Sequence, residues 1–400
     1  MRTSPFTQPS GAARRRDRWT SPSRGLRRGA RSRRGATAVL GLVLTTALVV
    51  LMAFSLDMGY IGVSRSELKR SADAAAIAGC WELYDGLVAR QSSAAMEAAV
   101  AETASEIAWS NPIGNQSPTL SLSDHGVQLG YYNAAAPGVF DTSDPSRFNA
   151  VRVHLRKNAS VNGEVPLFFG KLTGRDGQSL QTVATAAMLQ TISGFRAPPN
   201  GAPNLQLLPF ALDQETWHAV LAGETQDQWG YSNGNTVRGA DGYWECNLFP
   251  QGTGSAGNRG TVDIGHSSNS TSDLVRQILY GISASDLDAL GKDLEFDADG
   301  KLTLEGNTGI SAAMKDPLEQ IIGETRCIPI FTDVVFDGNR AVYTIVEFAG
   351  VRILDVKLTG AMERKHVTVQ PAFVIARNAI VTTPGTAHSS YVFAPVMLVE

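Results

Sequence analysis

The amino-acid sequence predicts an α+β protein, with a single N-terminal transmembrane helix that continues into an Ala-rich helix and is followed by β-rich extracytoplasmic modules. Three observations support this class. A long charge-free apolar run lies near the N-terminus, and a proline-free, alanine-rich stretch follows it. The rest of the chain alternates short apolar runs with Gly, Pro, Asn and Asp turn residues. With 400 residues, the chain is long enough for more than one folded module.

The apolar run covers residues 36–56, which are 21 positions without a charged side chain. As a helix it is roughly 31 Å long and matches a hydrocarbon core of about 30 Å. A buried core helix is one alternative, although few core helices lack charge over this length. A cleaved signal peptide is another, but its apolar centre is normally about 7–15 residues long. No small-residue cleavage site follows Leu56, so we expect a retained anchor over residues 35–60.

A basic segment precedes the apolar run. Residues 1–34 contain eleven Arg and one acid, Asp17, for a net charge of +10. The whole chain has a formal net charge of −3, so residues 35–400 carry −13. We expect a disordered cytoplasmic arm that is attracted to the anionic lipids of the inner membrane. The arginines also favour an N-terminus inside the cell, with the chain after Asp57 outside. The acidic remainder argues against nucleic acid as a partner.

The helix is expected to continue as an alanine-rich stalk over residues 61–110, since no proline interrupts this region. Small residues recur there at helical spacing, at Ala72, Ala75, Ala76 and Gly79. Such a face lets two helix backbones approach closely, so we interpret it as a docking face for a helix of another subunit. The alternative is that the same face packs against the protein's own β-rich module.

This part of the chain carries motifs of a known family. Arg34-Gly35-Ala36 opens the apolar run, Asp57-Met58-Gly59 ends it, and Ala72-Asp73-Ala74-Ala75-Ala76-Ile77-Ala78-Gly79 follows. Over about residues 33–80, this order resembles the N-terminal region of the TadG-like proteins of the Tad (Flp) pilus-assembly system. A weaker similarity continues through Val165-Pro166-Leu167-Phe168-Phe169 and Ala184-Thr185-Ala186-Ala187.

The resemblance implies a membrane-anchored, non-enzymatic component of a pilus-assembly or secretion apparatus. Its implied partners are other pilus-assembly or pseudopilin subunits. Its implied location is the bacterial inner membrane, crossed once, with the body in the periplasm or outside the cell. Some members carry a von Willebrand A domain, whose metal signature is Asp-x-Ser-x-Ser. The nearest string here, Asp141-Thr142-Ser143-Asp144-Pro145, fails at its last position, so we expect no metal and no cofactor.

Two further modules are expected after the stalk. Residues 115–192 contain two short strand-like runs at 119–132 and an alternating run at Val151–Leu155, so they predict a small β-rich module. Residues 193–204 are Pro-rich and predict a semi-rigid linker. Residues 205–400 predict an α+β module that is large enough for its own core.

Within the last module, helices are expected at Asp273–Tyr280 and Asp286–Leu290, with Ser272 and Ser285 as N-caps. The expected strands are Cys327–Phe336, Ala341–Phe348, Val351–Leu358, His366–Ile375 and Tyr391–Leu398. The turn at Asp337-Gly338-Asn339 predicts a hairpin between the first two of these strands.

The chain has three cysteines, which are too few for a disulfide scaffold. In an oxidising exterior, Cys246 and Cys327 could pair and leave Cys80 as a thiol. The two residues could equally be buried thiols. Both interpretations stay open from the sequence.

One string is compatible with an enzyme. Gly265-His266-Ser267-Ser268-Asn269 lies between an expected strand and an expected helix, as in a G-x-S-x-G nucleophile elbow, but Asn occupies the last position. The nucleophile would need a base and an acid from later in the chain, such as His366 or His388 and Asp333 or Asp355. A polar turn before a helix is the simpler interpretation. A membrane-anchored extracytoplasmic serine hydrolase that uses Ser267 is the alternative to the non-enzymatic function.

Overall fold

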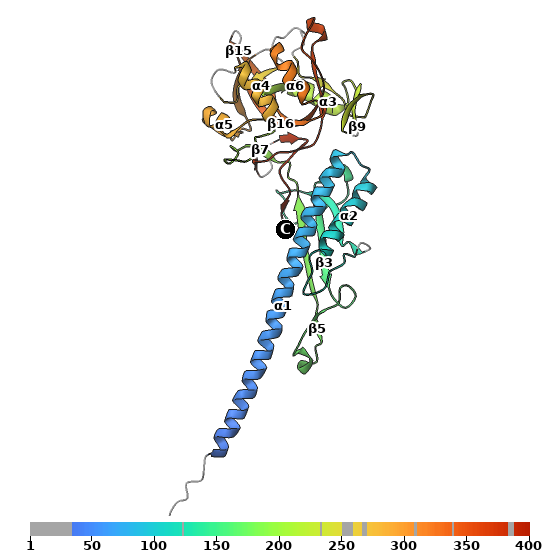
Figure 1. Cartoon of the computed structure of the whole chain (residues 1–400), viewed down its shortest axis with the longest axis vertical. Coiled ribbons are helices and arrows are strands. Elements are labelled where there is room, and N and C mark those ends of the chain that lie inside the picture. The colour runs from blue at the N-terminus through green and yellow to red at the C-terminus, as the bar shows by residue number, and fades with distance from the viewer. Residues whose placement is uncertain are drawn as a thin grey trace, which may run out of the picture. The chain divides into compact units, whose positions relative to one another are not determined.

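The computed structural model describes residues 34–121, 124–232, 234–249, 259–265, 270–307, 310–337, 340–382 and 388–400. The chain divides into two compact units, Met1–Ser55 and Leu56–Glu400. Helix α1 (Arg34–Val88) contributes to both of them. This helix, the further helices and the many strands confirm the predicted α+β class (Figure 1). The predicted basic arm, apart from Arg34, lies outside the described residues.

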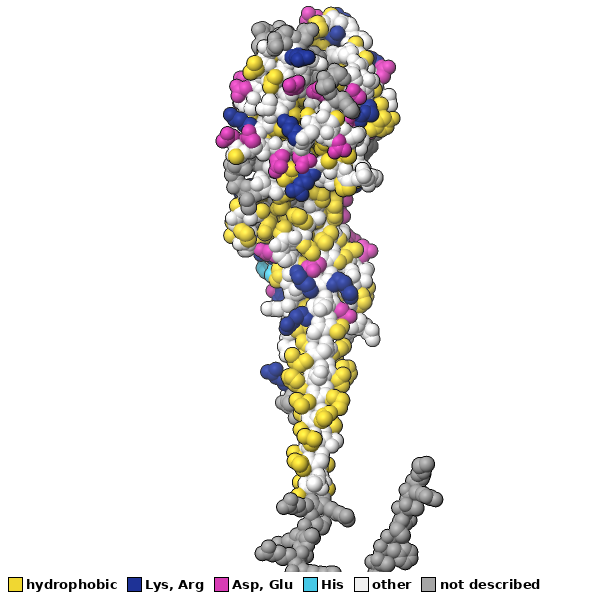
Figure 2. All heavy atoms as spheres, turned by 90° about the vertical axis from the view of Figure 1, so that its left-hand side faces the viewer, with side chains coloured by type: hydrophobic (Ala, Val, Ile, Leu, Met, Phe, Trp, Pro, Cys, Tyr) yellow, Lys and Arg dark blue, Asp and Glu magenta, His cyan; other side chains and the backbone are white. Residues whose placement is uncertain are grey.

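The described part of the first unit is the N-terminal part of α1. Its apolar side chains are exposed, for example Val39 at 63% and Leu51 at 68%, and they line the surface of the helix (Figure 2). The hydroxyls of Thr45 and Thr46 bond to carbonyls one turn earlier, at 2.8 and 2.9 Å, so neither hydroxyl lacks a partner. Among the described helices, α1 is the one long and apolar enough to cross a membrane.

In the second unit, the rest of α1 and helix α2 (Ser93–Trp109) pack on an antiparallel sheet (Figure 1). Five of the described strands form it, in the order β2 (Phe140–Asp141), β1 (Val127–Tyr132), β3 (Ala150–Lys157), β6 (Leu180–Ala187) and β22 (Met397–Leu398). Strands β3 and β6 pair over their whole length. Helix α2 begins after Ser92, whose side chain accepts a hydrogen bond from the amide of Ala95.

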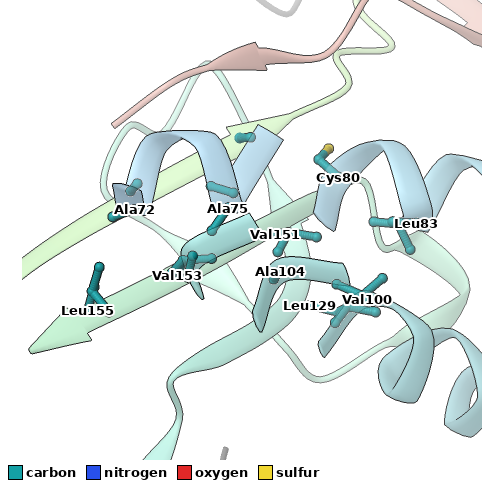
Figure 3. Packing of buried hydrophobic residues seen from close by; sticks show 14 of the residues in the cluster. Ala72, Ala75, Cys80, Leu83, Val100, Ala104, Leu129, Val151, Val153 and Leu155 are labelled. Carbon is teal, nitrogen blue, oxygen red and sulfur yellow. The ribbon is translucent and has the colours of Figure 1, made fainter. Parts of the chain in front are cut away.

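We call this sheet, together with α2 and residues 57–88 of α1, the first module. Its core combines small side chains of α1 with branched side chains of β3. Ala72 and Ala75 are fully buried against Val151 and Val153, and α2 closes the core with Val100 and Ala104 (Figure 3). Small side chains let the helix backbone approach the sheet, and this closeness increases the dispersion contact. The segment predicted as a stalk is therefore one wall of the module, and no boundary near residue 110 separates two cores.

A larger sheet lies in the C-terminal part. Eight of the described strands form it: β11 (Cys246–Asn247), β17 (His366–Pro371), β16 (Arg340–Lys357), β14 (Leu302–Asn307), β12 (Arg259–Val262), β8 (Phe210–Asp213), β15 (Thr325–Asp337) and β20 (His388–Ser390). Two buried apolar clusters pack on this sheet. Phe348 and Ala349 are neighbours in β16 but belong to different clusters, because successive side chains of a strand point to opposite faces.

Short elements complete the fold. The helices are α3 (Gln214–Ala222), α4 (Thr271–Tyr280), α5 (Ala284–Leu290) and α6 (Lys315–Gln320). The small strand pairs and the three-stranded sheet are β9 (Trp229–Ser232) with β10 (Asn235–Arg238), β4 (Val165–Pro166) with β5 (Gly177–Gln178), β18 (Val374–Ile375) with β21 (Val392–Phe393), and β13 (Leu294–Glu295) with β7 (Ile192–Phe195) and β19 (Ala379–Val381).

Two sequence-based boundaries differ from the structure. Strand β7 pairs with β13 and β19 and so takes in the first residues of the predicted linker, 193–204. The expected strand Tyr391–Leu398 is two strands, β21 and β22, and β22 pairs with β6 of the first sheet. The C-terminal residues therefore return to the first module and complete its sheet.

The strands expected at Ala341–Phe348 and Val351–Leu358 are one strand in the structure, with Gly350 in its interior. Strand β16 runs through it without a break. A Cβ added at Gly350 would lie 2.4 Å from the carbonyl oxygens of Ala372 and Tyr391. The glycine is needed because other backbone segments approach the strand closely, and not because the chain turns there.

Two helices begin earlier than expected. The N-caps are Ser270 for α4 and Ser283 for α5, in place of Ser272 and Ser285. Each cap hydroxyl accepts a hydrogen bond from the amide of an aspartate three residues later, Asp273 or Asp286. In each case two serines precede the aspartate. The serine three residues before it forms the cap, which is the spacing of a capping box.

Candidate functional site

Two of the motifs noted in the sequence meet at Asp57. The Asp57 carboxylate accepts hydrogen bonds from the amides of Phe168, at 2.8 Å, and Phe169, at 3.0 Å. Although it directly follows the apolar run, Asp57 is buried, with 7% of its surface exposed. Hydrogen bonds to an ionised acceptor are stronger than neutral ones. The carboxylate therefore ties a segment 111 residues away to α1.

We call residues 165–175 the Phe168 loop; it begins with β4 and leads to β5. Its closed shape comes from backbone hydrogen bonds, from Leu167 to the carbonyl of Asp176 and from Arg175 to the carbonyl of Gly170, each 3.0 Å long. A Cβ added at Gly170 would lie 2.5 Å from the carbonyl oxygen of Arg175. Gly174 adopts a φ of 77°, which favours glycine. The loop thus has a defined shape that does not depend on a ligand.

The loop presents aromatic side chains beside α1. The ring of Phe168 packs edge-on against Tyr60, with centroids 5.4 Å apart. Phe168 is nevertheless 66% exposed, and Phe169 is 38% exposed. The site thus contains two exposed aromatic rings beside a carboxylate that accepts hydrogen bonds from two backbone amides. Asp57 acts in it as a positioning residue.

The four small residues predicted as a docking face lie inside the first module. Ala72, Ala75 and Ala76 are fully buried and Gly79 is buried as well. A Cβ added at Gly79 would lie 3.2 Å from Val151 Cγ1 and 3.3 Å from a Cγ of Val100. The chain's own α2 and β3 therefore occupy this face, as in the alternative interpretation. In this structure the face is not open to a helix of another subunit.

Cys246 and Cys327 are not joined by a disulfide in this structure. Both are buried, but in the two different apolar clusters of the larger sheet. Strands β16 and β17 lie between their strands, β11 and β15. Three strand spacings amount to about 14 Å. A disulfide needs Cα atoms within about 7 Å, so the predicted pair could form only after the sheet rearranges.

We expect Cys80 and Cys327 to be thiols that do not react in the folded protein. Burial raises the pKa of Cys80 to about 12 and also raises that of Cys327, so neither forms a reactive thiolate near neutral pH. Alkylation before and after denaturation, followed by non-reducing peptide mapping, measures this. Both should be labelled only after denaturation, whereas a peptide cross-linked between Cys246 and Cys327 would contradict the arrangement of the sheet.

The proposed nucleophile Ser267 lies outside the described residues, and the side chain of His388 is not described either. His366 uses both ring nitrogens: Nε2 contacts Asp355 at 2.8 Å and Nδ1 contacts the carbonyl of Arg364 at 3.0 Å. A histidine that acts as a general base needs one nitrogen directed at the nucleophile. In this geometry, His366 and Asp355 form a structural pair.

The structure also contains a basic cleft that the sequence analysis missed. The cleft has a volume of about 760 Å³ and lies between the end of α1 and the larger sheet. Arg326 and Arg352 line it and are 5% and 6% exposed, and each has a buried Nε without a hydrogen-bond partner. Arg326 pairs with Glu324 at 2.6 Å, whereas Arg352 lies 3.5 Å from the ring centre of Tyr231. Two arginines on adjacent strands give no linear motif, so only the fold reveals the cleft.

Comparison with known families gives two matches, both in the N-terminal half. Residues 35–101 match the family model described as Flp pilus-assembly TadE/G-like. Residues 74–186 match the model described as Tad-like Flp pilus-assembly. The first match contains Asp57 and the second contains the Phe168 loop, so the hydrogen bonds at Asp57 join the two matched regions. No curated protein and no solved structure matches the chain.

Proposed function

We propose that this chain, a TadG-like protein of the Tad system by its two Flp pilus-assembly matches, is a membrane-anchored, non-enzymatic component of the pilus-assembly apparatus. The observation that carries the proposal is the continuity of α1. One helix contains the charge-free run and, further along, the buried residues of the first module's core. Such a helix supports the role of a membrane anchor that is continuous with a folded body.

Further features of the proposal follow from charge. The arginines before the run favour an N-terminus in the cytoplasm, where they would contact the anionic lipids of the inner membrane. The acidic body would then lie in the periplasm or outside the cell. Its partners would be other pilus-assembly or pseudopilin subunits, with no role for nucleic acid. The hydrolase alternative gains no support from His366, since both of its ring nitrogens are engaged.

Gene deletion with complementation tests this function. In a bacterium that encodes this chain, the deletion should abolish surface pili, and the full chain should restore them. A Ser267→Ala variant should restore them equally well, whereas a variant with polar residues in place of residues 36–56 should not. Electron microscopy counts the pili, and immunoblots of membrane fractions control for protein level. Normal pili in the deletion strain would contradict the proposal, and failure of Ser267→Ala at a normal protein level would favour the hydrolase.

A reporter fusion tests the orientation. Alkaline phosphatase, which is active only outside the cytoplasm, should be active when it is fused after Glu400 of the full chain. This site leaves both modules intact. A cytoplasmic reporter at the same site should be inactive. The opposite pair of activities would show that the arginines do not set the orientation.

A further inference from the structure

The Phe168 loop lies at a defined level along α1. Its amides bond to Asp57, which is the first charged residue after the uncharged run of residues 36–56. If that run spans the hydrocarbon core, the polar edge of the bilayer lies at about Asp57. The ring of Phe168 packs against Tyr60, one helical turn further along. The loop is thereby held beside α1 at the level where the helix leaves the membrane.

The surface at this level is apolar. Phe168 and Phe169 are exposed on the loop, and Met58 of α1 is 51% exposed. Two consecutive exposed phenylalanines in a loop of closed shape indicate a surface that a lipid bilayer or a protein partner covers. Aromatic and apolar side chains at such a level are typical of segments that lie in the membrane–water interface.

The charges of the loop fit the same environment. From Leu167 to Arg175 the sequence has two cations, Lys171 and Arg175, and no acid. Both cations are exposed. Two acids flank this stretch: Glu164, which accepts a hydrogen bond from the hydroxyl of Ser179 at 2.5 Å, and Asp176, which is exposed. Lipid phosphates carry the charge that complements such cations.

We propose that the Phe168 loop inserts its two phenylalanine side chains into the membrane–water interface on the side where α1 leaves the membrane after residue 56. Lys171 and Arg175 would contact lipid phosphates there. The protein would then hold the bilayer at two points, through α1 and through this loop. The hydrogen bonds at Asp57 would keep the two points at one level. This inference rests on the membrane anchoring proposed above.

Depth-dependent fluorescence quenching of the full chain tests the inference. Three variants, Phe168→Cys, Leu48→Cys and Val335→Cys, are each labelled with an environment-sensitive fluorophore. The chain without these changes serves to measure labelling of the native cysteines. The proteins are reconstituted into vesicles of phosphatidylethanolamine and phosphatidylglycerol that carry a nitroxide either near the headgroup or near the end of the acyl chain. Val335 is a matched control, because it is an apolar residue of the larger sheet that is 69% exposed.

The label at position 168 should lose more emission to the shallow nitroxide than to the deep one. The label at position 48 should show the reverse order, and the label at position 335 should be quenched by neither. Quenching at position 48 together with none at position 168 would overturn the loop inference and leave the anchor in place. In that case a protein partner would cover the phenylalanines. Absence of quenching at position 48 would overturn the anchoring itself and, with it, this inference.

A charge-reversal variant tests the contact with lipid phosphates separately. Lys171→Glu and Arg175→Glu are added to the labelled Phe168→Cys chain and leave both glycines of the loop in place. In this background, the label at position 168 should move outward, so that the shallow nitroxide quenches it less. Quenching equal to that of the unchanged loop would contradict the contact with lipid phosphates.

Discussion

Ala75→Leu should destabilise the first module, because Ala75 is fully buried between α1 and the sheet. A larger side chain must displace α1 from α2 and β3, and overpacking of this kind typically costs about 1–3 kcal/mol. The measurement is thermal or chemical unfolding of the full chain in detergent, followed by tryptophan fluorescence. We expect the variant to unfold at a clearly lower temperature than the unchanged chain, and pilus assembly to fall with it.

The matched control is Ala98→Leu, the same change at an exposed alanine of α2. Alanine and leucine have similar helix propensities, so this variant should keep its stability. The experiment also decides the role of the small-residue face. If Ala75→Leu left the unfolding temperature unchanged and abolished association with another pilus subunit, the face would be a docking surface after all.

This test is needed because the sequence could predict close packing but not its partner. Alanine and glycine permit close approach to any backbone, whether of another subunit or of the same chain. The complementary signal was present in α2, whose buried residues Met96, Val100, Ala104 and Ala108 follow a spacing of four. That spacing defines a second apolar face beside the first and favours two helices on one sheet. The residues of α1 alone therefore do not distinguish a helix of another subunit from the chain's own module as the partner of this face.

The contact at Asp57 could not be predicted in the same way. The sequence identified both of its segments, the polar end of the apolar run and the Val165–Phe169 motif. Their contact depends on backbone amides, which every non-proline residue carries and which leave no mark in the sequence. Likewise, the strands expected before and after Gly350 are one strand, β16, and the sequence alone does not reveal the close approach of other backbone segments to this glycine. Long-range contacts of the main chain are thus the part of the site that only the structure provides.

Asp57→Ala should release the Phe168 loop from α1. The change leaves the amides of Phe168 and Phe169 without their acceptor, and a hydrogen bond to a charged group contributes about 1.5–3 kcal/mol. Hydrogen exchange measured by mass spectrometry on the full chain should show faster exchange at these two amides. The hydrogen bonds of the β3–β6 pair should exchange as before, because they do not involve Asp57.

Two variants sharpen this test. Asp57→Asn keeps a carbonyl oxygen as an acceptor but loses the charge, so its exchange rates should lie between those of the unchanged chain and Asp57→Ala. Asp85→Ala removes an exposed acid from the same helix and should change neither the exchange nor the pili. If Asp57→Ala left the exchange of Phe168 and Phe169 unaltered, the hydrogen bonds to Asp57 would not be what holds the loop beside α1. If it freed the loop and the pili still formed normally, the fixed position of the loop beside α1 would have no part in assembly.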